Sequence, residues 1–164
     1  MSTPSQLIDE YVAGVTTLRD AVASMSPEQL KARPIPGKWS TLEVVCHLSD
    51  FEPIMADRMK RIIAEDRPSL LGADEKRFAA ALAYHERDAE EELALIEQTR
   101  RQMARILRTV PAEAFQRVGV HNERGPLTLE KMLTVTVNHI PHHVQFIHDK
   151  RKALGLPPAQ GSDE

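Results

Sequence analysis

The seven histidines are the side chains of this sequence with the greatest capacity for chemistry. Four of them fall within ten residues, between His139 and His148. His139 and His143 are four positions apart, so in a helix their side chains lie on one side, one turn from each other. Neutral imidazole is a common protein ligand for zinc and nickel. The spacing therefore predicts two arms of a metal site.

A helical projection separates the members of this cluster. His139 and His143 lie together on one shoulder of the apolar stripe, whereas His142 falls on nearly the opposite face. His148 lies on the other shoulder. We therefore expect His142 and His148 to be solvated residues outside the site.

His47 occupies a similar shoulder position on an earlier amphipathic segment. Two imidazoles one turn apart and a third on a packed neighbour can hold a divalent ion and leave positions open for water or substrate. Geometry alone also permits half-buried histidines that only form hydrogen bonds. His85 and His121 lie in or beside connecting segments, and we expect them at the surface.

Composition limits the alternatives. The 164 residues suffice for one packed domain, and the single cysteine excludes an internal disulfide framework. The net charge of −3, the interleaved charges and the 4% aromatic content argue against nucleic acid as a ligand. The sequence shows no signal-peptide pattern and no apolar run of membrane-spanning length, so we expect a cytoplasmic protein that does not bind membranes.

The elements that must position these histidines follow from apolar residues spaced three and four apart, which are typical of amphipathic helices. They predict four long helices and an all-α four-helix bundle, in a single domain over 1–156 with a frayed tail over 157–164. The long helices are expected at about 4–24, 40–64, 86–109 and 128–154, with a short helix at 74–82 in a long crossover and a turn or short hairpin at 118–126.

Two sequence motifs extend this interpretation. The run GKWSTLEVVCHLSDFE (37–52) and the run NHIPHHVQFI (138–147) resemble the paired motifs of the DinB-like superfamily, also called YfiT-like metal-dependent hydrolases. The resemblance covers nearly the whole chain. It implies an up-down-down-up bundle whose metal is held by His47, His139 and His143.

The resemblance also implies the chemistry. Water on such a metal ion has a lowered pKa and can act as a nucleophile, so a metal-dependent hydrolase acting on a small molecule is the leading hypothesis. An open metal position can also bind a thiolate, and other family members transfer low-molecular-weight thiols such as bacillithiol or mycothiol. A non-catalytic metal-binding stress-response protein is the third alternative. We expect zinc or nickel as the metal and a homodimer as the assembly.

Several neighbours of the histidines are candidates for supporting roles. Glu43 is either the carboxylate of a capping box with Ser40 or a base near the metal. Trp39 forms either a wall of the site or a hydrophobic staple, and we interpret Cys46 as a small core residue. The sequence around Arg87 predicts a charged turn at the start of a helix.

Overall fold

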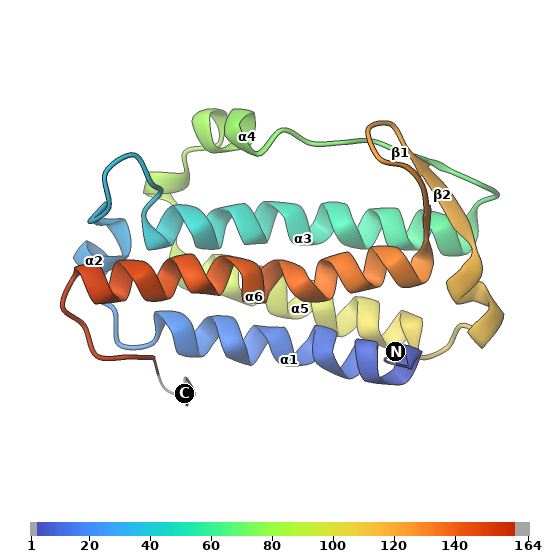
Figure 1. Cartoon of the computed structure of the whole chain (residues 1–164), viewed down its shortest axis with the longest axis horizontal. Helices are drawn as coiled ribbons and strands as arrows, with labels where there is room; N and C mark the ends of the chain where they lie inside the picture. The colour runs from blue at the N-terminus through green and yellow to red at the C-terminus, as the bar shows by residue number, and fades with distance from the viewer. Residues whose placement is uncertain (1–2, 160–164) are drawn as a thin grey trace.

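Four amphipathic segments form the long helices of the computed structural model, which describes residues 3–159. They are α1 (Pro4–Val22), α3 (Thr41–Ala64), α5 (Ala89–Leu107) and α6 (Leu129–Ala153). α1 and α6 run in one direction and α3 and α5 in the other (Figure 1). α6 packs against α1 and α3, and α5 packs against the same two helices. The up-down-down-up bundle implied by the sequence is confirmed.

Side-chain caps determine where these helices begin. Ser40 accepts a hydrogen bond from the Glu43 backbone N–H, and the Glu43 carboxylate accepts one from the Ser40 backbone N–H, which completes the predicted capping box. Thr128 caps α6 in a simpler way, by accepting from the backbone of Lys131. α5 begins at Ala89, three residues later than predicted, because Asp88 is its N-cap.

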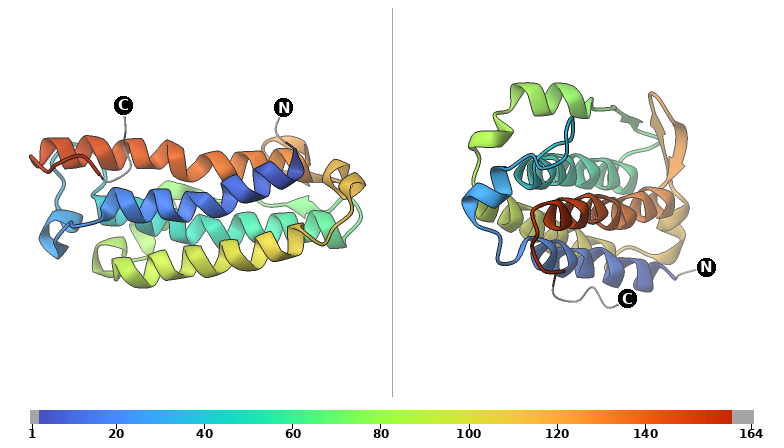
Figure 2. Two further views of the ribbon diagram at one scale, coloured as in Figure 1. Left: turned by 90° about the horizontal axis from the view of Figure 1, so that it is seen from below. Right: turned by 60° about the vertical axis from the view of Figure 1, so that its left-hand side comes forward.

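The connections contain more structure than the sequence indicates. The predicted crossover helix is present as α4 (Glu75–Ala81), and the 3-10 helix η1 (Tyr84–Glu86) follows it in the same crossover. The short helix α2 (Pro27–Lys31) and the 3-10 helix η2 (Ala112–Gln116) lie in other connections. The predicted hairpin is formed by β2 (Val118–His121) and β3 (Gly125–Thr128). The strand β1 (Ser69–Leu70), which was not predicted, pairs in parallel with β2. The crossover between α3 and α5 therefore passes along the outside of α3, with β1 near one end and α4 near the other (Figures 1 and 2).

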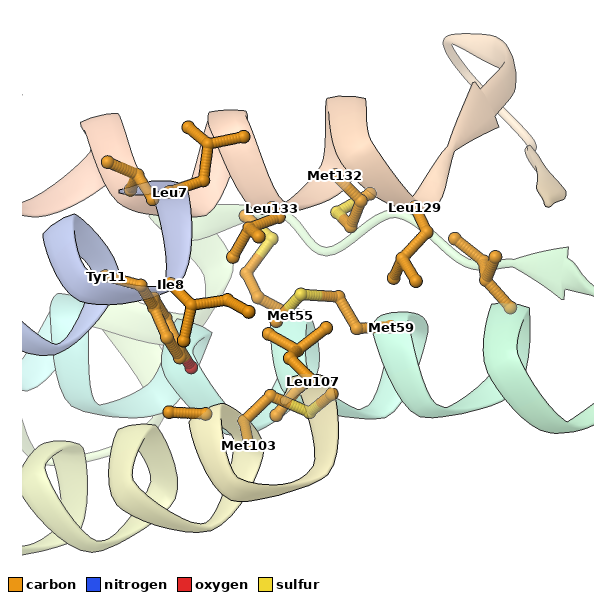
Figure 3. Close-up of a cluster of buried hydrophobic side chains, with 14 of the residues drawn as sticks. Leu7, Ile8, Tyr11, Met55, Met59, Met103, Leu107, Leu129, Met132 and Leu133 are labelled. Carbon is orange, nitrogen blue, oxygen red and sulfur yellow. The ribbon is translucent and has the colours of Figure 1, made fainter. Parts of the chain in front are cut away.

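Apolar side chains fill the bundle in two main clusters. One cluster is rich in methionine and lies where the start of α1, the second half of α3 and the first half of α6 meet (Figure 3). The other lies along the first half of α3 and the second half of α6, around Leu18, Leu48, Ile96 and Ile140. These clusters hold the facing surfaces of α3 and α6 together.

A buried polar network links all four long helices between these clusters. The Arg100 guanidinium, which is fully buried, pairs with Glu52 at 2.9 Å and donates to the backbone carbonyls of Tyr11 and Thr136. The Tyr11 hydroxyl donates to the same Glu52 carboxylate at 2.7 Å. Each charge in this network is therefore compensated by a neighbour.

The outer parts of the chain add three observations. Within residues 3–159, no helix is long and apolar enough to cross a membrane. The predicted frayed tail falls partly on residues 160–164, which lie outside the described residues. In the described part, the Pro157 carbonyl accepts two hydrogen bonds from Arg151.

Candidate metal centre

Three histidines from two helices converge between α3 and α6. His47 comes from the first half of α3, and His139 and His143 lie one turn apart on α6. One ring nitrogen from each lies within 4.8 Å of the corresponding nitrogens of the other two. The Nε2 atoms of His47 and His139 are only 3.1 Å apart. The structure therefore brings together the three residues selected by the helical projections and the family motifs.

The surroundings of these rings keep them neutral. Burial lowers the pKa of His47 to about 4. Burial, and secondarily the neighbouring histidines, lower the pKa of His139 and of His143 to about 3. At neutral pH each imidazole then has an unprotonated nitrogen with a free lone pair, which is the form that binds a metal ion.

The donor set fits a divalent metal ion. Two imidazole nitrogens bound to one tetrahedral ion at roughly 2.0–2.1 Å lie about 3.4 Å apart, close to the separation of the two facing Nε2 atoms. The Nδ1 atoms of His47 and His139 are buried and have no hydrogen-bond partner among the described residues. The group is therefore not a hydrogen-bonded cluster in which every ring nitrogen is satisfied.

Aromatic rings pack around the histidines. The Trp39 ring lies 5.5 Å from the His47 ring, and the Phe51 ring lies 4.6 Å from it, measured between centroids. Phe146 packs against His143 at 5.7 Å. Trp39 also lines the cavity beside His143, so it forms a wall of the site, as one of its two predicted roles requires.

A cavity of about 460 Å³ opens beside His143. Its lining includes Trp39 and Phe146, three lysines and two carboxylates. Cavities of about 600 and 1010 Å³ lie elsewhere in the described part of the chain, and no histidine lines either of them. Of the three imidazoles, His143 lines this cavity, so a small molecule bound there would lie beside the three-histidine group.

Glu75, at the start of α4, is the carboxylate that reasoning from the sequence missed. Its Oε2 lies 4.0 Å from the His47 Nε2. Its side chain is 54% exposed and lines the same cavity. α4 is too short and irregularly patterned to indicate which of its residues faces the bundle, so only the folded crossover shows this proximity.

Glu43, one turn before His47 on α3, is held by partners near the start of that helix. Its carboxylate accepts hydrogen bonds from the Arg33 guanidinium and from the Ser40 backbone. The Arg33 pairing and the backbone hydrogen bonds lower the pKa of Glu43 although burial alone would raise it. The capping-box role is thus confirmed, and the role of a base stays a prediction.

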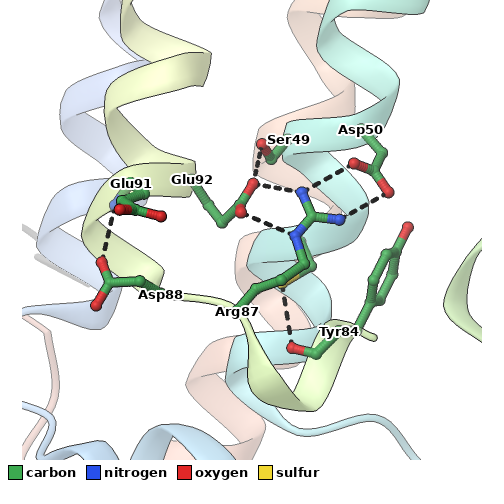
Figure 4. Close-up of polar contacts among 8 residues, drawn as sticks. Ser49, Asp50, Tyr84, Arg87, Asp88, Glu91 and Glu92 are labelled. Atoms are coloured by element: carbon green, nitrogen blue, oxygen red, sulfur yellow. Dashed lines mark hydrogen bonds and ion pairs between the residues drawn. The ribbon is translucent and has the colours of Figure 1, made fainter. Parts of the chain in front are cut away.

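Arg87 ties the end of the crossover to α3. Its guanidinium pairs with Asp50 on α3 and with Glu92 on α5, and Glu92 also accepts from Ser49 (Figure 4). Arg87 lines the 600 Å³ cavity rather than the cavity beside His143. The predicted charged turn therefore joins α3 and α5 through these ion pairs.

The remaining histidines and the cysteine occupy different environments. His142 and His85 are exposed and His148 is half-buried, and none of these joins the three-histidine group. The prediction for His121 was wrong: it is only 4% exposed, because it lies on β2, the central strand of the sheet, paired with β1 on one side and β3 on the other. Its Nδ1 accepts a hydrogen bond from the Glu123 backbone. Cys46 is fully buried, as predicted.

Comparison with known proteins identifies the family. The sequence model of the DinB superfamily matches residues 10–147, so the chain belongs to this superfamily. A Bacillus subtilis protein named "Putative metal-dependent hydrolase YfiT" is 28% identical over 151 residues, which cover 92% of this chain and 83% of the relative. An Oceanobacillus iheyensis relative with the same type of name is 28% identical over 145 residues, covering 86% of this chain and 84% of the relative.

A solved structure supports the same assignment. The structure of YfiT from Bacillus subtilis, described as having an unusual four-helix bundle topology, matches with a TM-score of 0.88 at 26% identity. The match covers 96% of this chain and 91% of that chain. This chain and YfiT therefore share one fold, which includes the helices that carry the three histidines.

Proposed function

We propose that His47, His139 and His143 hold one divalent metal ion in a hydrolase that acts on a small molecule. The observation that carries this proposal is the convergence of three neutral imidazoles, with two Nε2 atoms 3.1 Å apart, beside a cavity of about 460 Å³. An all-imidazole donor set favours zinc or nickel. A divalent ion bound there would supply Lewis acidity toward a water molecule and a substrate carbonyl.

Glu75 is positioned to move the proton in such a hydrolysis. Its carboxylate oxygen, 4.0 Å from the His47 Nε2, is within reach of a water molecule beside the three imidazoles. It would accept a proton from that water as the water oxygen bonds to the substrate carbonyl carbon. It would then deliver the proton to the leaving group as the bond between that carbon and the leaving group breaks.

The site proposal is tested by the metal content of purified protein. We expect about one divalent ion per wild-type chain and almost none in His47→Ala, His139→Ala or His143→Ala, because two imidazoles bind much more weakly than three. His142→Ala is the matched control, since His142 lies on the same helix but outside the group. Stoichiometric metal in the three site variants would contradict the assignment.

The hydrolase proposal needs a second test, on ester and amide substrates with the metal-loaded protein. Glu75→Gln should lower kcat by about 10²–10⁴-fold while metal content is unchanged, because it removes the proton acceptor and not a ligand. Glu113→Gln, which changes an exposed carboxylate in η2, is the control. Turnover that occurs only when a small thiol and an electrophile are supplied would contradict the hydrolase proposal and indicate that the protein catalyses thiol transfer. The homodimer and the cytoplasmic location stay predictions from the sequence.

A further inference from the structure

Lys150 is a buried ammonium group beside the histidines. Only 3% of the residue is exposed, although it lines the cavity that also contains His143. Its ammonium donates to the Phe146 carbonyl at 3.1 Å and lies 6.0 Å from the centre of the Phe146 ring. An ammonium has three N–H donors, so two remain for another partner.

The described residues leave the charge of Lys150 without an ion pair. No carboxylate oxygen among residues 3–159 lies within 4.0 Å of its ammonium, in contrast to Arg87 and Arg100, which both pair with carboxylates. Burial, and secondarily the positive charge of Lys38, lower the pKa of Lys150, whereas Asp149 and Glu43 raise it. A buried cation without an ion pair is costly, and an anion beside it would remove part of that cost.

The charges around the cavity favour an anion. Three lysines line it, at positions 38, 76 and 150, against two carboxylates, Glu75 and Asp149. Of these two carboxylates, Glu75 lies 4.0 Å from the His47 Nε2. Lys38 is exposed, so its flexible side chain can reach a ligand that enters from solvent.

The rest of the lining is apolar. Ile35, Trp39, Val44 and Phe146 contribute to the walls, and Phe146 is 41% exposed despite its size. A cavity of about 460 Å³ is large enough for a small organic molecule, since ligand sites span roughly 300–1,000 Å³. An apolar wall with a cationic end recognises a molecule with an apolar body and an anionic group.

We propose that this cavity binds a small substrate through an anionic oxygen group, carboxylate or phosphate, held by Lys150 and Lys38, with its apolar body against Trp39 and Phe146. This inference rests on the proposed function, because it places the reacting part of the substrate next to His143. It goes further by naming the two lysines that determine which small molecules bind. Lys150 and His143 both line this cavity.

The test uses the single tryptophan as the reporter. Because Trp39 lines the cavity and no other tryptophan is present, its emission reports binding there. Zinc-loaded protein is titrated at constant ionic strength with phenylacetate, its neutral analogue phenylacetamide, and phenyl phosphate. We expect at least one of the two anions to bind about tenfold or more tightly than phenylacetamide, and the stronger of the two identifies the preferred group.

Variants show whether the lysines are responsible. Lys150→Met and Lys38→Met should each reduce the preference for the anion by about fivefold or more, while Lys150→Arg should retain most of it. Lys131→Met, which removes an exposed lysine near the other end of α6, is the matched control. Lys150→Met should not lower Tm, because methionine fills a similar volume without a buried charge. An anion preference unchanged in both lysine variants would overturn the proposal.

A metal-free variant separates this proposal from the metal site. Zinc content is measured in every sample, so a failure of the three-histidine assignment is seen directly and independently of ligand binding. In His139→Ala, the preference for the anion over phenylacetamide should persist, since the lysines are unchanged. A preference that disappears in His139→Ala but survives in the lysine variants would show that the metal ion itself binds the anion, which also overturns the proposal.

Discussion

Two buried polar clusters lie within the same helix bundle, and they differ in how completely the chain supplies their partners. In the Arg100 network, Glu52 receives both the guanidinium and the Tyr11 hydroxyl, so the charges are paired, and among the described residues Arg100 Nε alone of this network has no partner. In the histidine cluster, two Nδ1 atoms are buried without partners, and two Nε2 atoms face each other. The paired network is what a structural role requires, whereas the unpaired cluster has nitrogen lone pairs available for a ligand.

The largest expected effect is on the paired network. Arg100→Met should lower the free energy of unfolding by about 3–5 kcal/mol, because it leaves the Glu52 carboxylate buried without its cation. Urea denaturation measures this change. Arg101→Met, at the adjacent exposed position, should change stability by less than about 0.5 kcal/mol. A loss below about 1 kcal/mol for Arg100→Met would show that the network contributes little to the stability of the fold.

The histidine cluster should respond to metal instead. At a free zinc concentration 100–1,000 times the dissociation constant, bound metal should raise the free energy of unfolding by about 3–4 kcal/mol, and a chelator should reverse this gain. Thermal unfolding with and without chelator measures the effect. His139→Ala should show no response to either reagent. Equal responses in wild type and His139→Ala would place the metal elsewhere.

Gly14 is closely packed against the Arg100 guanidinium. A Cβ added at Gly14 would lie 2.5 Å from Arg100 Nη1, which is held by its hydrogen bond to the Tyr11 carbonyl. Gly14→Ala should therefore cost about 1–3 kcal/mol. In an Arg100→Met background the same substitution should cost less, and a double-mutant cycle measures the difference. Additive effects would indicate that the two residues do not compete for space.

The smallest effect concerns alkaline pH. Burial, and then the Glu52 charge, raise the pKa of Tyr11 above its ordinary value near 10. Above that pH the unfolded chain releases the Tyr11 proton while the folded chain retains it, so stability falls as pH rises, by up to about 1.4 kcal/mol per pH unit for this group. Tyr11→Phe should flatten the decline by that amount. Denaturation series from pH 9 to 11.5 would contradict the prediction if the two slopes were equal.

Regular patterns in the sequence predicted most of the bundle. The apolar periodicity and the Ser40 capping box located the long helices, and the four-residue spacing of His139 and His143 predicted their convergence. Glu75 and Lys150 could not be found in this way. The position of Glu75 depends on how the crossover folds back over α3, and Lys150 resembles any lysine near a helix C-terminus until its burial is known. The burial of His121 depends on strand pairing between segments about fifty residues apart, which local patterns do not report.

Because α3 and α5 run in the same direction, part of the cavity wall comes from a different segment than the metal ligands (Figure 1). Because the chain must return along the whole bundle before α5 begins, a long segment crosses the outside of α3 and brings Glu75 and Lys76 to the cavity (Figure 1). The three histidines belong to α3 and α6, whose apolar faces form the core, whereas α4, which carries Glu75 and Lys76, has no buried residue. Exchange of the crossover between relatives could therefore alter substrate choice while the metal ligands and the bundle are inherited unchanged.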